Sequence, residues 1–177
     1  GEKTLIILCE EGIEELDLSL FSGKNVYLAT IENPEDLTPE KLEACKNNHK
    51  IDRVIIEYNG MWMLKDLYEN LPEDWFIFQN MMFADANTFR AYNANMRSLM
   101  VDKLLDCEMI VLNRTPENID KEEIHKVARG ISRRASITYD YPDGHVEYDE
   151  IEDPLPFDID APVIEIDEND YAVWYRD

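Results

Sequence analysis

The sequence predicts an α/β protein of three layers, in which helices cover both faces of a mostly parallel sheet. Short apolar runs typical of buried strands alternate along the chain with segments of helical character. Hydrophobic residues make up 45% of the chain, and its 177 residues are enough for one domain with a substantial core. These observations favour a folded protein of the doubly covered, open-sheet class.

The first half contains three predicted strands and two predicted helices that connect them. Strands are expected at 4–8, 25–31 and 53–57, because each range is an apolar, β-branched run. Residues 12–21 are acidic with apolar residues at helical spacing, which favours a short helix. Thr38, Pro39 and Glu40 form a good helix start, and that helix is expected to end near His49.

The second half repeats the alternation of strands and helices. Strands are expected at 75–85, 109–112 and 136–139, and helices at 61–70, 87–106 and 120–133. The helix over 87–106 has one apolar stripe with a spacing of three and four residues. Asp120 and Glu123 have the spacing of a capping box and predict the start of the last helix.

The composition changes after Tyr139. Residues 140–177 are rich in acidic residues and prolines, and we expect an acidic C-terminal segment that leads to a further domain in a longer protein. Its apolar residues Leu155, Phe157 and Ile159 are expected to lie against the domain of residues 1–139. Residues 163–166 and 171–175 alternate enough to predict short strands.

Charge and cysteine content limit the classes of function. The formal net charge of −22 disfavours binding to nucleic acid and to anionic membranes. No apolar run approaches the length of about 20 residues that a membrane-spanning helix needs. Three widely spaced cysteines do not form a disulfide framework and indicate a reducing compartment, so we expect a cytoplasmic protein.

The range Asp52–Gly60 carries the strongest functional signal. Glu57 closes an apolar strand, and Gly60 follows three residues later. The carboxyl ends of parallel strands form the ligand edge of an open α/β sheet, so Glu57 is predicted to project a carboxylate there. Gly60 has no Cβ and lets the backbone approach a ligand closely. Glu57 is the candidate catalytic residue, and a strand end that merely turns into a helix is the alternative.

Two further strand ends carry polar residues. Asp85 closes a strand, either to face a ligand or to cap the helix that follows. Asn113 and Arg114 close the next strand, where GTPases read guanine with N-K-x-D. Here Arg114 replaces the Lys and Pro116 occupies the Asp position, so guanine specificity is not predicted. Gly60, Asn113 and Arg114 are the candidate nucleotide-binding residues.

Several motifs that would support other chemistry are absent from the sequence. No strand leads into G-x-x-x-x-G-K-[ST], so the loop that grips phosphates is missing. His49, His125 and His145 lack the spacing of metal ligands, and we expect each of them to lie isolated at the surface. We predict no metal-binding residues.

Taken in order, these segments resemble the CobW branch of the CobW/HypB/UreG-like GTPases. Residues 9–12, 52–60 and 85–86 are similar to three strand-end motifs of that family, and Asn113 and residues 134–137 are similar to two more. The likeness covers roughly residues 3 to 139. It implies the three-layer fold of P-loop NTPases.

The resemblance also implies a function. Members of the family act as nucleotide-driven metallochaperones or metal-insertion factors, which implies GTP, Mg²⁺ and a metalloenzyme client for a full-length protein. The family's Walker A loop and C-x-C-C motif do not occur here. We therefore expect a truncated or degenerate form that does not hydrolyse GTP, or else a non-catalytic interaction domain on the same scaffold. Met61–Met63 and the acidic segment would then contact a protein partner.

Overall fold

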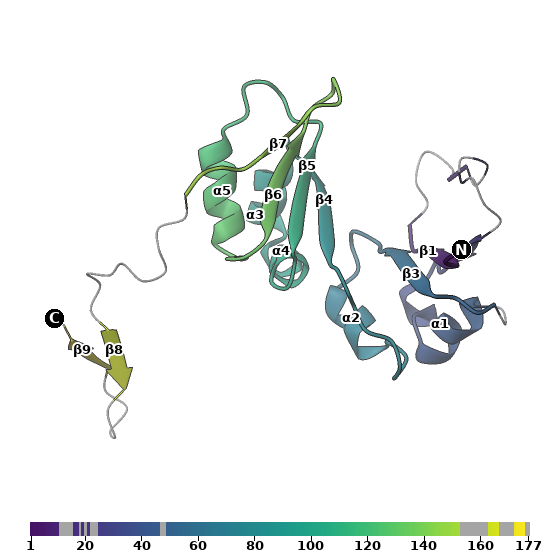
Figure 1. The fold of residues 1–177 in the computed structure, drawn as a ribbon. Helices are drawn as coiled ribbons and strands as arrows, with labels where there is room; N and C mark the ends of the chain where they lie inside the picture. Colours follow the sequence, from purple (N-terminus) through teal and green to yellow (C-terminus); the bar gives the residue numbers. More distant parts are fainter. Residues whose placement is uncertain are drawn as a thin grey trace.

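The fold was analysed in a computed structural model of the chain. It describes residues 1–10, 16, 17, 19, 21, 25–46 and 49–152, together with the backbone of Val163–Ile166 and Ala172–Tyr175. Most of the expected helix at 12–21 lies outside the described residues. Leu155, Phe157 and Ile159 lie outside them as well. Within it the protein is α/β, with parallel strands and connecting helices, as the sequence predicts (Figure 1).

The first sheet has three parallel strands in the order β2-β1-β3. They are β1 (Thr4–Leu8), β2 (Val26–Thr30) and β3 (Arg53–Glu57). A short 3₁₀ helix (Pro34–Asp36) precedes α1 (Pro39–Cys45), and α2 (Leu64–Glu69) follows β3. Helix α1 begins as the sequence predicts, because the Thr38 side chain accepts a hydrogen bond from Lys41 N at 3.2 Å. Leu5 and Ile7, on one face of β1, are fully buried in the core of this part.

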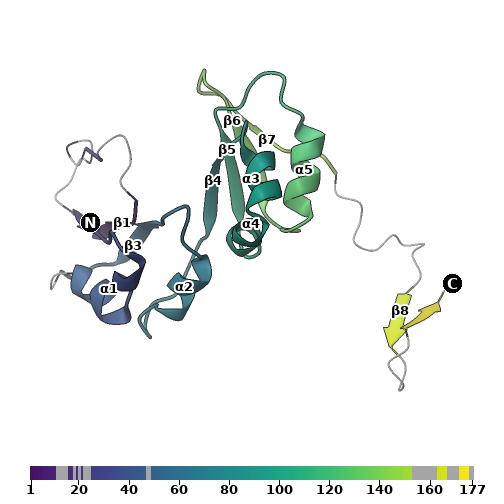
Figure 2. The ribbon, with the colours of Figure 1, turned by 180° about the vertical axis from the view of Figure 1, so that it is seen from behind.

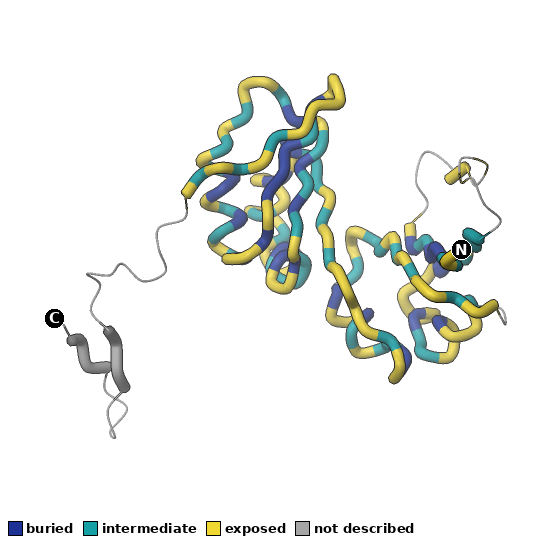
Figure 3. The backbone as a smooth tube through the Cα atoms, in the orientation of Figure 1, coloured by how far each residue is buried: buried dark blue, intermediate teal, exposed yellow. Residues whose placement is uncertain are grey.

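The second sheet has the order β4-β5-β6-β7. Strands β4 (Met81–Asp85), β5 (Met109–Asn113) and β6 (Ser136–Asp140) are parallel, and β7 (Val146–Tyr148) is antiparallel to β6. The connecting helices are α3 (Phe89–Asn95), α4 (Arg97–Leu104) and α5 (Lys121–Arg129). Figures 1 and 2 show these three helices on the same face of the sheet. Figure 3 shows buried segments in β5 and β6, where Ile110, Leu112 and Tyr139 have no exposed surface.

The expectation of a single sheet is wrong for the described residues. Strands β3 and β4 do not pair, so the two parallel sheets stay separate, and β8 (Val163–Ile166) and β9 (Ala172–Tyr175) form a further antiparallel pair. Strand β7 extends the second sheet beyond Tyr139. Within each sheet the paired strands align residue by residue without a break. The sequence contains no signal that determines which strand lies beside β3.

Two expected elements are shorter than predicted. Residues 75–80 do not join the strand that ends at Asp85, because pairing with β5 begins only at Met81 opposite Met109. The helix expected over 87–106 breaks at Met96, whose φ of −129° and ψ of 47° lie outside the helical region. Asparagine has low helix propensity, and Asn93 and Asn95 precede this break.

Helix α4 is tied to the segment that follows β3. The Asp102 carboxylate accepts hydrogen bonds from Leu64 N at 2.5 Å and Lys65 N at 3.2 Å, at the start of α2. Lys103 Nζ donates to the carbonyl of Asn59 at 3.0 Å and lies 4.6 Å from the ring centroid of Tyr58. We call these contacts of Asp102 and Lys103 the α4 clamp.

No helix in the described part of the chain is long and apolar enough to cross a membrane.

Replacing Asp102 with alanine is expected to lower the free energy of unfolding by about 1–2 kcal/mol, because two N–H groups at the start of α2 lose their acceptor. Urea unfolding followed by circular dichroism measures the change. Asp74→Ala is the matched control, since Asp74 is exposed. Equal losses in the two variants would contradict the capping role of Asp102.

Candidate functional site

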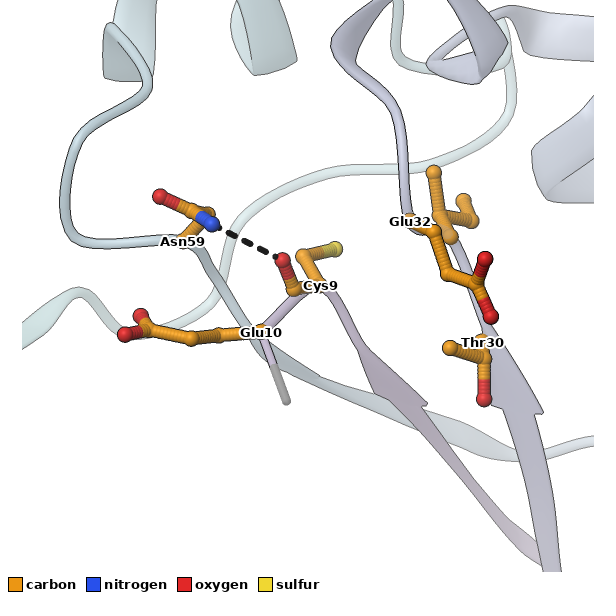
Figure 4. A pocket seen from close by; sticks show the side chains of 6 residues that line it. Cys9, Glu10, Thr30, Glu32 and Asn59 are labelled. Carbon is orange, nitrogen blue, oxygen red and sulfur yellow. Dashed lines mark hydrogen bonds between the residues drawn. The ribbon is translucent and has the colours of Figure 1, made fainter. Parts of the chain in front are cut away.

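The carboxyl ends of the first sheet surround a hollow of about 340 Å³. It lies where open parallel sheets usually bind ligands, beyond the ends of β1, β2 and β3. Figure 4 shows Glu10 on one side of it and Glu32 and Thr30 on the other. The lining residues are Cys9, Glu10, Thr30, Ile31, Glu32 and Asn59.

The hydrogen-bond donors of the segment that follows β3 are already bonded to groups of the same chain. Gly60 N donates to the Glu10 carboxylate at 3.0 Å. The Asn59 side-chain amide donates to the Cys9 carbonyl at 3.2 Å, as the dashed line in Figure 4 shows. Met61 N donates to the Asn59 side chain at 2.8 Å. The Gly60 amide, expected to lie close to a bound nucleotide, therefore faces a carboxylate of the same chain.

Glu57 lies at the end of β3, as predicted, with an exposed side chain. Its backbone carbonyl accepts a hydrogen bond from Cys9 N at 2.9 Å. The hollow is lined by Glu10 and Glu32 rather than by Glu57. Sequence reasoning did not single out these two carboxylates, although each follows the last residue of a parallel strand by two positions.

Cys9 is the most perturbed group of the hollow. Burial, followed by the nearby Cys45 and Glu57, raises the pKa of the Cys9 thiol to about 11. A neutral thiol is a poor nucleophile and a poor metal ligand at neutral pH. Among the described residues, no group of three or more His, Cys, Asp or Glu side chains is arranged to hold a metal ion. The hollow therefore offers carboxylate acceptors and no cationic donor.

The carboxyl edge of the second sheet carries a different polar group, formed at the ends of β4 and β5. Arg114 Nη1 pairs with the Asp85 carboxylate at 3.0 Å. The Asn87 side chain donates to Asp85 at 3.0 Å and to the Arg114 carbonyl at 3.1 Å. The side chain of Asn87, its backbone N–H and the Arg114 guanidinium together lower the pKa of Asp85. Asp85 therefore organises the turn before α3 through Asn87 and Arg114, but it does not cap that helix, whose N-cap is Thr88.

Two features of this edge are not explained by the contacts that hold the turn together. Arg114 has a φ of 52°, the left-handed region that non-glycine residues rarely adopt. Asn113 Oδ1 is buried without a hydrogen-bond partner within the described residues. The turn itself is fixed by Thr115, whose hydroxyl donates to the Leu112 carbonyl at 2.8 Å. A strained backbone beside an unpartnered acceptor is the kind of arrangement that a bound ligand completes.

The structure does not bring all the predicted residues to one sheet. Glu57 and Gly60 belong to the first sheet, whereas Asn113 and Arg114 belong to the second. The expectation that every histidine lies isolated at the surface is wrong for His125, which is buried and lies 2.5 Å from the Asp149 carboxylate. Its place beside Ile124 and three residues before Ala128, on the apolar face of α5, was the available signal.

The chain matches no family model, no curated protein and no solved structure.

Cys9 is expected to react slowly with iodoacetamide at pH 8, because its raised pKa of about 11 keeps the thiol neutral there. Its rate should rise as the pH approaches 11. Mass spectrometry of peptides after timed alkylation resolves the three cysteines, and the less buried Cys45 should react first. Alkylation of Cys9 at the rate of a free thiol at pH 8 would contradict its burial.

Arg114→Gly is expected to be more stable than Arg114→Ala by about 1 kcal/mol, because glycine adopts a positive φ without steric cost. Both variants lose the exposed Asp85 ion pair, so their difference isolates the backbone strain. Urea unfolding provides the measurement. Equal stability of the two variants would show that residue 114 leaves the left-handed region in solution.

Proposed function

We propose that this chain carries the base-facing and metal-facing parts of a CobW-like nucleotide-binding protein, of the metallochaperone and cobalamin-biosynthesis-related type, as a fragment or degenerate form. The proposal rests on the order of the motifs and on the parallel α/β architecture. The observation that carries it is the buried Asn113 Oδ1, which has no hydrogen-bond partner among the described residues, beside the strained Arg114. An acceptor in that position suits the amino or amide donors of a nucleobase.

The base and phosphate parts of such a ligand fit this chain unequally. Asn113 would accept a hydrogen bond from the base, and Arg114 would lie against the ring plane, as arginine does on aromatic faces. Glu57 would face Mg²⁺ or its water, and Gly60 N would meet the terminal phosphate. However, Gly60 N already donates to Glu10, and Glu32 lines the same hollow, so a phosphate there would displace one carboxylate and approach another.

Tight binding and hydrolysis of GTP are not expected of residues 1–177. Phosphate affinity in nucleotide-hydrolysing folds comes mainly from backbone N–H groups and the lysine of a phosphate loop. This chain has no such loop, and its net charge of −22 repels a triphosphate. Any nucleotide contact would therefore come from the nucleoside, through Asn113 and Arg114.

A second candidate function is a non-catalytic interaction domain with a protein partner. It is favoured by large apolar side chains left in solvent, namely Met61 at 60% exposure, Phe76 at 80% and Phe78 at 86%. Surfaces of this kind commonly mark protein-interaction sites.

Guanosine and Mg²⁺-GTP are expected to bind this chain with similar, roughly millimolar affinity, because the phosphates add no favourable contact. Titration followed by NMR should shift the side-chain amide signals of Asn113. Asn113→Ala should abolish the saturable binding, whereas Asn118→Ala, at an exposed asparagine five residues away, should leave it unchanged.

Two results would overturn the proposal in different ways. Sub-micromolar binding of GTP by calorimetry would show that phosphates are gripped without a phosphate loop. Saturation by neither ligand, or binding that survives Asn113→Ala, would remove the base-facing role of Asn113 and favour the interaction domain.

A further inference from the structure

A second hollow, of about 580 Å³, lies at the opposite edge of the second sheet, where β5 and β6 begin. One wall comes from the end of α4 and the approach to β5, and the other from the turn between α5 and β6. The lining residues are Leu105, Asp106, Cys107, Glu108, Ile131, Ser132, Arg133 and Arg134. This edge is distinct from both carboxyl edges considered above.

The wall between α5 and β6 carries uncompensated positive charge. Arg133 and Arg134 are exposed, and within the described residues neither forms an ion pair or a hydrogen bond through its guanidinium. The chain holds 39 acidic and 17 basic residues, so two adjacent arginines with no ion-pair partner in the part of the chain that the structure describes are unusual. Asp106 and Glu108 lie on the opposite wall, which directs a negative ligand to the arginine side.

The hollow also offers apolar contact. Leu105 is 61% exposed at its rim, and Ile131 packs partly buried against the core beneath it. A ligand that combines carboxylates with apolar side chains would satisfy both features, whereas a small inorganic anion would use only the arginines.

Strand β7 directs the chain toward this region. It runs antiparallel to β6, and its last ladder contact is Asp149 N to the Ile137 carbonyl at 2.9 Å. The Asp149 side chain is 1% exposed and is held 2.5 Å from His125 Nδ1 on α5. Figure 1 shows β7 reaching the side of α5, the helix that leads into the arginine turn. The path after β7 is thus anchored on the element that carries Arg133 and Arg134.

The chain is long enough to span the remaining distance. Arg134 precedes Ile137 by three residues, which limits their separation to about 10 Å, and paired strands lie about 5 Å apart. Residues 153–160 begin four residues after Asp149, and an extended chain covers about 3.3 Å per residue. Residues in the middle of this segment can therefore reach the hollow without any change in β7.

We propose that the arginine hollow is the docking site of this chain's own segment Asp153–Asp160. Its sequence, Asp-Pro-Leu-Pro-Phe-Asp-Ile-Asp, supplies three carboxylates for Arg133 and Arg134 and two large apolar residues, Leu155 and Phe157, for Leu105 and Ile131. Pro154 and Pro156 restrict the backbone to extended conformations, which lowers the entropy lost on docking. Docking at this edge leaves both carboxyl edges open to a ligand, so it does not depend on the proposed nucleotide role.

Hydrogen exchange of the full chain, followed by mass spectrometry, tests this docking. Amides of peptides covering 153–160 should exchange about fivefold faster in Arg133→Glu/Arg134→Glu, because solvent-exposed ion pairs at a rim contribute only modestly to docking. Lys65→Glu/Arg97→Glu changes the net charge equally on exposed helix positions and should leave these amides unaffected. Adding 1 M NaCl to the unaltered chain should also speed the exchange, which provides a measurement independent of any folding defect.

Three outcomes would overturn the proposal. Exchange of residues 153–160 at the rate of an unstructured peptide in the unaltered chain would exclude docking. Equal acceleration in both variants would assign the effect to net charge alone. Protection that increases with protein concentration would show that the segment docks on a second copy of the chain.

Discussion

The α4 clamp is the contact on which the relation between the two parallel sheets depends. The sheets share no paired strand, so the segment after β3 is held to the second sheet's helices by Asp102 and Lys103. Burial lowers the pKa of Lys103, although Asp102 and Glu10 oppose this effect. The ammonium is stabilised by the Asn59 carbonyl and the face of Tyr58, since a buried cation needs such partners to stay charged. The clamp thus places Glu10 and Asn59, two residues of the first hollow, next to α4.

The two carboxyl edges differ in how completely their polar groups are satisfied. In the first sheet, Gly60 N donates to the Glu10 carboxylate and the Asn59 side chain donates to the Cys9 carbonyl, and Glu32 adds a second carboxylate that repels a phosphate. In the second sheet, Asp85 and Asn87 bind the outside of the Arg114 turn, and the Asn113 oxygen inside it remains unpartnered among the described residues. Unsatisfied polarity and backbone strain occur together at the second edge only. This contrast explains why the proposed ligand contact lies at Asn113 rather than at Glu57.

Particular elements show why local patterns succeed or fail as predictors. Thr38 and Asp120 cap their helices as the sequence predicts, because a cap depends on residues within one turn. The apolar stripe over 87–106 contains the buried Phe89, Met100 and Leu104, but its Tyr92 is exposed and it does not reveal the break at Met96. Residues 75–80 have strand composition but no neighbouring strand to pair with. His125 appeared isolated because its partner, Asp149, is 24 residues away in the chain.

The sequence alone determined the α/β class, the parallel strands, the strand-end positions of Glu57, Asp85 and Asn113, and the absence of a phosphate loop. These properties follow from hydrophobic periodicity and from residue types, which act over a few neighbouring residues. The tertiary structure decided that β3 and β4 belong to different sheets, that Glu10 takes the Gly60 amide, and that Asn113 Oδ1 is left without a partner in the described chain. Such features depend on which distant segments come into contact, and local residue patterns and spacings do not predict those contacts.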